Sequence, residues 1–184
     1  MRLLVWKVVA VAVFAATMSL STRAQSSSLV CSDATLTGDY AFTVSGQLFL
    51  PNGTVVQRLG IGIVHFDGKG NFTQEDLVLS SPNAPPPPGV GPTNAEGFNI
   101  DEKGTYAVHA DCTGAFTIEF PELKTPTGGS VKGAVISVHF VIDNGGRAFH
   151  TVVTSLTPPG APGPVPALIH SDGHKVSATE ENQQ

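Results

Sequence analysis

The chain has 184 residues, of which 41% are hydrophobic and 14% are charged, and its net charge at pH 7 is −5. Ten Phe residues and the low charged fraction exclude an intrinsically disordered chain. The acidic balance disfavours binding to nucleic acid or to anionic lipid, because both need basic patches.

Residues 1–24 have the layout of a secretory signal peptide. Two basic residues precede an apolar run, Val8–Met18, and small and polar residues follow it up to Ala24. The apolar run has about 11 residues, whereas a membrane-spanning helix needs about 20; a retained membrane anchor is the alternative. We expect cleavage after Ala24 and a secreted or periplasmic protein without a membrane span. The remaining 7 basic and 15 acidic residues give a net charge of −8.

The 160 residues that follow fit a single domain. We expect a leader and floor connector over 25–38, a β-barrel domain over 39–175 and a polar tail over 176–184. In an exported chain the two cysteines, Cys31 and Cys112, are expected to form one disulfide. A pair of metal-binding thiols is the alternative, but neither Cys-x-x-Cys nor Cys-His spacing supports it.

Alternating apolar and polar residues between turn motifs predict eight β-strands. The clearest alternation is at Phe116, Ile118 and Phe120, and the clearest hairpin turn is Asp67–Asn71, which reads Asp-Gly-Lys-Gly-Asn. No window of the mature chain predicts a helix. The expected strands are Asp39–Leu50, Val55–Asp67, Asn71–Ser80, Gly104–Ala110, Cys112–Phe120, Val131–Ile142, Arg147–Ser155 and Ala167–Ser171 or slightly longer.

Eight sequential antiparallel strands favour a single up-and-down barrel, because closure removes exposed sheet edges. A β-sandwich is the alternative. In a barrel the short turns gather at one end, and the long connections, among them the proline-rich 81–92 and 157–166, gather at the other. The disulfide would draw residues 31–38 across the short-turn end. We therefore expect a closed floor and a mouth with proline-rich loops.

Four segments resemble a pattern found in exported bacterial β-barrel proteins of unknown function. In those proteins a Gly-x-Tyr strand start, an Asp-Gly-x-Gly-Asn turn and an Asp-Cys-Thr-Gly turn recur in that order. The resemblance covers roughly residues 31–155 and implies no activity. The strand layout also resembles calycin and allene-oxide-cyclase-like barrels, which implies a fold alone, and no catalytic residue is carried over. The matching segments are CSDATLTGDYAFTVSGQ, VHFDGKGNFTQ, GTYAVHADCTGAFTIEF and FVIDNGGRAFHTVVTS.

Catalytic and cofactor motifs are missing from the sequence. It contains no His-x-His pair for a cupin-type metal site, no Gly-x-Ser-x-Gly nucleophile motif and no phosphate-binding loop. Asp67–Asn71 offers too few oxygen ligands for a calcium loop. We therefore expect no cofactor and no metal site.

Candidate polar groups for the barrel lumen are His65, Glu75, His139 and His150. The adjacent Asp101 and Glu102 are set aside as an acid pair, because neighbouring strand residues face opposite ways.

The leading hypothesis is a non-enzymatic exported binding module for a small apolar ligand. Its contact zone is the mouth, formed by residues 51–54, 81–95, 121–130 and 157–166. A cyclase- or isomerase-like enzyme with a lumenal site is one alternative, and a structural or adhesive envelope protein is another. Strands with two apolar faces also predict that part of the outer wall is covered, with a homo-oligomer as one such arrangement.

Overall fold

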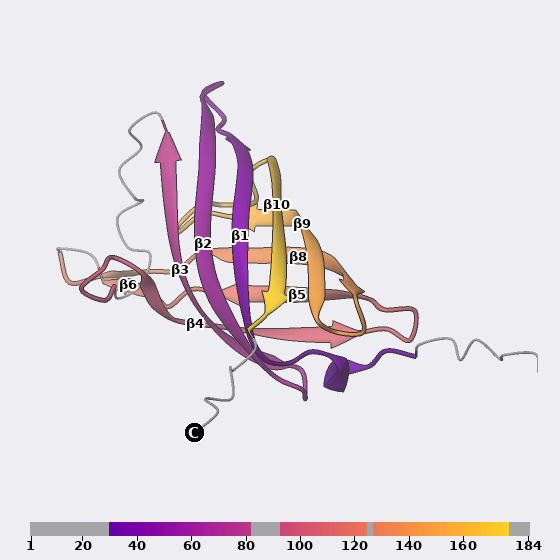
Figure 1. The fold of residues 1–184 in the computed structure, drawn as a ribbon. Coiled ribbons are helices and arrows are strands. Elements are labelled where there is room, and N and C mark those ends of the chain that lie inside the picture. Colours follow the sequence, from indigo (N-terminus) through magenta and orange to yellow (C-terminus); the bar gives the residue numbers. More distant parts are fainter. Residues whose placement is uncertain (1–29, 82–92, 125–126, 177–184) are drawn as a thin grey trace, which may run out of the picture.

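The computed structural model describes residues 30–81, 93–124 and 127–176. Within these ranges eight antiparallel strands close into a barrel in the order β1-β10-β9-β8-β5-β4-β3-β2 (Figure 1). Strand β1 closes the ring by pairing with both β2 and β10. The predicted up-and-down barrel is confirmed. The strands are β1 (Thr37–Phe49), β2 (Val55–Asp67), β3 (Asn71–Ser81), β4 (Asn99–Val108), β5 (Thr113–Glu119), β8 (Val135–Asp143), β9 (Ala148–Thr157) and β10 (Ala167–Lys175).

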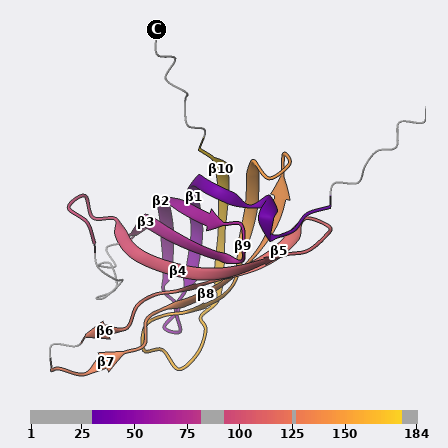
Figure 2. The ribbon, with the colours of Figure 1, turned by 90° about the horizontal axis from the view of Figure 1, so that it is seen from below.

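The connection between β5 and β8 contains two further short strands, β6 (Leu123–Lys124) and β7 (Ser130–Val131), which pair only with each other. Figure 2 shows this hairpin projecting away from the barrel. Its presence corrects the prediction of a strand starting at Val131, since β8 begins at Val135. The described residues contain one helix, the single 3₁₀ turn η1 (Asp33–Thr35). No helix among them is long and apolar enough to cross a membrane.

Strand β4 differs most from its prediction, because it begins at Asn99 and not at Gly104. Asp101 has a φ of 65°, and the pairing of β3 with β4 shifts register between Gln74 and Asp76. This bulge interrupts the alternation with period two by which a strand is recognised in sequence. The irregular start of β4 also sets the direction of several polar side chains described below.

Strand β10 runs past Ser171 to Lys175, which is the expected end of the barrel domain. Its polar second half pairs with β1, where Lys175 lies opposite Tyr40. Backbone pairing with β1 and β9 holds this segment in the sheet although its side chains give no apolar alternation.

The segment from Cys31 to Leu36 closes the end of the barrel at which the short turns lie. Cys31 is joined by a disulfide to Cys112, which follows β4, as predicted. Leu36 is only 1% exposed and packs in the main core cluster, and its carbonyl accepts a hydrogen bond from the Tyr106 hydroxyl at 3.0 Å. Figure 2, seen from below, shows η1 lying beside this end of the barrel. The predicted floor is present.

Above the floor, four inward-facing glycines each lie opposite a Phe of a neighbouring strand. A Cβ added at any of them would lie 2.2–2.4 Å from a ring carbon of that Phe, which is far inside van der Waals contact. Only glycine lets the rings lie against the opposing backbone, so the aromatic side chains fill the floor half of the lumen. The pairs are Gly62 with Phe42, Gly104 with Phe72, Gly114 with Phe140 and Gly173 with Phe149.

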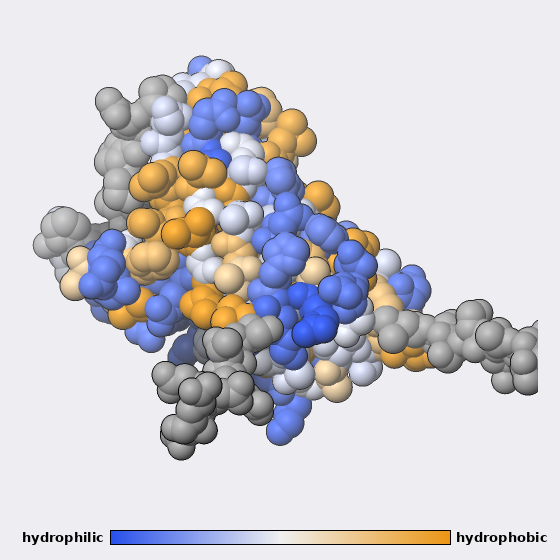
Figure 3. All heavy atoms as spheres, viewed as in Figure 1, coloured by the Kyte–Doolittle hydropathy of each residue, from blue (hydrophilic) through white to orange (hydrophobic). Residues whose placement is uncertain are grey.

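The outer face of β2 and β3 carries exposed apolar side chains. Leu59 of β2 is 63% exposed and lies opposite Leu79 of β3, which is 61% exposed. Ile61 and Ile63 continue the row along β2. Figure 3 shows apolar side chains gathered on this face of the barrel. The homo-oligomer expected from such a wall stays a prediction.

Candidate ligand site in the barrel lumen

A cavity of about 340 Å³ occupies the lumen between the aromatic layer and the mouth. This volume lies at the lower end of the range of small-molecule sites, about 300–1,000 Å³. At the mouth its lining includes Leu50, Phe120 and Pro158, which lie in the connections that follow β1, β5 and β9. Strands β5, β8, β9 and β10 supply a mainly apolar wall, lined by Phe116, Ile118, Ile136, Val138, Val153 and Ile169.

The facing wall, formed by β2, β3 and β4, carries a stripe of polar side chains. Arg58 extends from β2, Gln74 and Asp76 from β3, and Asn99 from β4, and all four line the cavity. Glu102 of β4 lies behind them and is completely buried. We call these five residues the polar stripe.

Strand geometry explains why these residues face inward. Phe66 and Phe72 lie opposite each other across the β2–β3 hairpin, and both belong to the core cluster. Counting by two from Phe72 places Gln74 and Asp76 on the same inner face. On β4 the bulge at Asp101 adds one residue, so that Asn99 and Glu102 both face inward although they are three positions apart.

Side-chain amides hold the two buried carboxyl groups of the polar stripe. Asn99 Nδ2 donates to Asp76 Oδ1 at 2.8 Å, and Gln74 Nε2 donates to Glu102 Oε2 at 2.8 Å. Gln74 Nε2 also lies 3.5 Å from Asp76 Oδ2. Glu102 Oε1 is buried without a hydrogen-bond partner among the described residues. An ionised carboxylate is costly in such a place.

Burial changes the protonation of this acid pair. Removal from water raises the pKa of Glu102 to about 9, and the charge of Asp76 acts in the same direction. Burial also raises the pKa of Asp76, and this effect outweighs the hydrogen bonds from Asn99 and Gln74 and the charge of Arg58, which lower it. The neighbouring Asp76 carboxylate favours the proton on Glu102. Glu102 is therefore neutral at pH 7.

Arg58 lies nearer the mouth, where its Nη1 donates to Ser80 Oγ at 2.6 Å. Burial lowers the pKa of the guanidinium, and the neighbouring Asp76 carboxylate opposes this change. Among the residues that the structure describes, no ion pair within 4.0 Å joins Arg58 to Asp76. The guanidinium therefore lines the cavity as a donor that is bonded to Ser80 and is not paired with Asp76.

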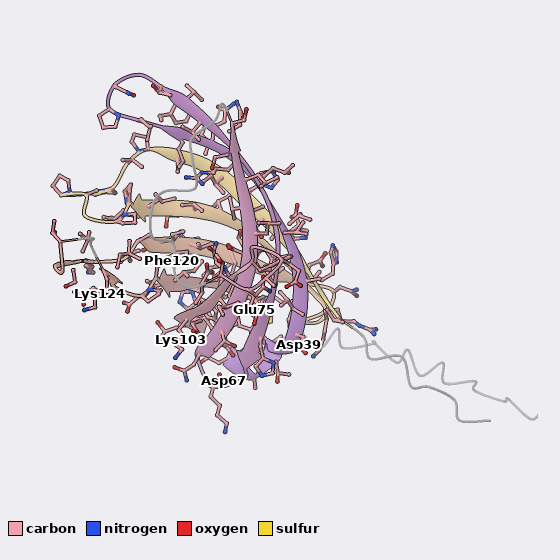
Figure 4. All side chains as sticks on the ribbon, turned by 90° about the vertical axis from the view of Figure 1, so that its left-hand side faces the viewer. Asp39, Asp67, Glu75, Lys103, Phe120 and Lys124 are labelled. Atoms are coloured by element: carbon pink, nitrogen blue, oxygen red, sulfur yellow. A yellow bond between two sulfur atoms is a disulfide. The ribbon has the colours of Figure 1, made fainter. Side chains whose placement is uncertain are left out.

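The four side chains predicted from sequence to face the lumen lie on the outer wall instead. His65, Glu75, His139 and His150 are all exposed, because each alternates with an inward-facing residue of its strand. His65 Nδ1 lies 2.7 Å from Asp39, and His150 pairs with Asp172 on the outer surface. The positions of Glu75 on β3 and of Asp39 on β1 can be followed in Figure 4, where both residues are labelled.

Sequence reasoning missed the whole polar stripe. The signal that could have found half of it is the hairpin itself: once Phe66 and Phe72 are taken as an inward pair, Gln74 and Asp76 must face inward too. Asp101, the neighbour of Glu102 in sequence, is exposed and faces the other way, as expected for adjacent strand residues. The actual partner of Glu102 is Asp76, on the adjacent strand.

The expected contact zone at the mouth is described only in part. Residues 51–54, 81, 93–95, 121–124, 127–130 and 157–166 lie within the structure, whereas 82–92 and 125–126 lie outside the described residues. Pro158 and Pro159 of the β9–β10 connection line the cavity. The search for groups of three or more His, Cys, Asp or Glu residues that could hold a metal finds none in the described ranges.

No family model, curated protein or solved structure matches this chain. The barrel and its polar stripe are therefore the grounds on which function is argued.

Proposed function

We propose that this protein is an exported binding module whose barrel lumen takes one small, mainly apolar molecule with a polar end. The supporting observation is the cavity of about 340 Å³, which has one apolar wall and one wall with a cluster of buried polar groups. An apolar body would pack against β5, β8 and β9, while its polar end would meet the stripe. The disulfide fits an oxidising compartment and therefore supports export.

A lumen filled with side chains would argue against this function and for a structural or adhesive envelope protein. Here the aromatic layer fills only the floor half, and the remaining cavity is lined rather than filled. A barrel of eight strands can hold one small ligand in this way.

A matched pair of substitutions tests the proposal. Ala134 lines the cavity, and Ala115 is exposed on the outer wall of β5. We expect Ala134→Phe to weaken binding of the neutral fluorescent probe N-phenyl-1-naphthylamine by about tenfold or more, since the ring occupies lumen volume, and Ala115→Phe to leave it unchanged. Equal binding by both variants would place the probe elsewhere and contradict the proposal. Native mass spectrometry of the protein from its own host would then identify the bound molecule.

The acid pair favours one second candidate, a lumenal enzyme that moves a proton on an apolar substrate. Asp76 lines the cavity beside neutral Glu102, and acid–base catalysts are found where burial shifts a carboxyl pKa in this way. Asp76 would contact the substrate. Glu102 would position the Asp76 side chain and would itself stay protonated. Incubation of the recovered ligand in D₂O separates the two functions: an enzyme predicts deuterium incorporation that is lost in Asp76→Asn, whereas a carrier predicts none.

A further inference from the structure

The polar stripe carries one positive and one negative charge. Asp76 and Glu102 are neighbouring buried carboxyl groups that Gln74 Nε2 approaches at 3.5 and 2.8 Å, and the charge of Asp76 favours the neutral form of Glu102. Asp76 lines the cavity, accepts a hydrogen bond from Asn99 and lies near Arg58, whereas Glu102 is completely buried behind it. Asp76 is therefore the member of the pair that carries the negative charge, and Arg58 supplies the positive one.

These opposite charges lie apart on the wall of the cavity. Arg58 and Asp76 both line the lumen, yet no ion pair within 4.0 Å connects them in the described part of the chain. The side chain of Arg58 turns toward Ser80, which lies opposite it on β3. Asp76 lies four residues deeper along the same strand, opposite Asn99. The hydrogen-bond donor Arg58 thus lies near the mouth, and the acceptor Asp76 lies deeper in the lumen.

We propose that the lumenal ligand is uncharged and carries a hydrogen-bond acceptor next to a donor, as in a primary carboxamide, on an apolar body. This inference rests on the proposed binding function. The carbonyl oxygen of the ligand accepts from the Arg58 guanidinium, and its N–H group donates to the Asp76 carboxylate. The apolar body lies against the wall opposite the stripe.

A charged head group fits the same wall less well. A carboxylate would gain the attraction of Arg58 but would also meet the repulsion of Asp76, and an amine would meet the reverse pair. Either one would also lose its hydration on entering a mainly apolar cavity. An amide satisfies both wall groups and brings no net charge, so Arg58 and Asp76 stabilise it together.

The test uses the full mature protein with its disulfide intact and four ligands with the same eight-carbon chain. Octanamide, octanoate, octylamine and N,N-dimethyloctanamide compete with N-phenyl-1-naphthylamine at pH 7, with fluorescence as the readout. We expect octanamide to displace the probe at about tenfold lower concentration than the other three, because each of those leaves a buried group unpaired or opposed. The dimethyl compound isolates the contribution of the N–H donor.

Two variants reverse the charge balance of the stripe and keep the test decisive. Asp76→Asn leaves Arg58 unopposed, so octanoate becomes the best competitor. Arg58→Met leaves Asp76 unopposed, so octylamine does. Gln57→Ala, exposed and adjacent on β2, is the control and keeps the wild-type order. Far-UV circular dichroism confirms folding, and if Arg58→Met does not fold, the shift in Asp76→Asn decides alone.

Each outcome bears on one of the two claims. Displacement by octanoate or octylamine as effective as by octanamide overturns the inference about the head group, while the lumen site stands. An unchanged order of competitors in the folded variants overturns it as well. Failure of the wild-type protein to bind the probe overturns the lumen site itself and, with it, the proposed function.

Discussion

Replacement of Glu102 by Gln should stabilise the folded protein at neutral and alkaline pH. Glutamine has the same shape, and its carbonyl oxygen can accept the hydrogen bond that Gln74 donates to Glu102 Oε2. The side-chain NH₂ group of the glutamine then takes the place of Glu102 Oε1, which is buried without a partner, and can donate toward Asp76. The substitution thus keeps the contacts of the neutral acid and removes the group that ionises.

The sign and size of the effect follow from proton linkage. The folded state raises the pKa of Glu102 from 4.5 to about 9, so between these values the folded protein holds a proton that the unfolded chain has released. The contribution of Glu102 to stability is complete below pH 4.5 and is lost as the pH rises, at about 1.4 kcal/mol per pH unit. At pH 7 the loss is on the order of 3 kcal/mol, which Glu102→Gln avoids.

Urea unfolding followed by far-UV circular dichroism at pH 5, 6, 7 and 8 measures this difference. Fluorescence of tryptophan is not suited to it, because Trp6 lies in the predicted signal peptide. The free energy of unfolding of Glu102→Gln minus that of the wild type should grow steadily with pH. Glu75→Gln, the same change on an exposed side chain of β3, should stay within about 0.5 kcal/mol of the wild type throughout. A difference that does not change with pH, or that falls, would refute the assignment of a buried neutral Glu102.

Three further changes test the floor and the aromatic layer. Leu36→Ala, in the buried floor segment, should lower the free energy of unfolding by about 2–5 kcal/mol, whereas Leu59→Ala, 63% exposed, should change it little; equal losses would contradict the floor. Replacing Cys31 and Cys112 by Ser opens a link between positions 81 apart and should lower stability by about 4–5 kcal/mol on the chain-entropy estimate, and an unchanged melting temperature would contradict this. Gly104→Ala places a Cβ 2.2 Å from a Phe ring and a backbone oxygen and should cost about 1–3 kcal/mol in urea unfolding; a neutral result would show that the layer can relax.

The apolar pattern and the turn residues predict most of the fold. Val55–Asp67 is recovered with the bounds that the structure gives, because turn residues stand on both sides of it, Pro51–Gly53 before and Asp67–Asn71 after. The disulfide is predicted from two cysteines in a chain expected to be exported, and the floor follows from that link together with which ends of the strands meet. The apolar pattern fails at the start of β4, where a bulge breaks the alternation.

The residues of the lumenal site could not be predicted from each strand taken by itself. The sequence of a strand identifies His65 and Glu75 as polar groups but does not show which face of the strand turns inward. An error of one residue in that choice moves every side chain of the strand to the other side of the barrel wall. By itself the sequence determined a barrel, its disulfide and its mouth, because apolar period, turn chemistry and cysteine number are local properties. Only the tertiary structure decided that Asp76 and Glu102 meet in the lumen, because their contact depends on the register between β3 and β4 and on the bulge that shifts it.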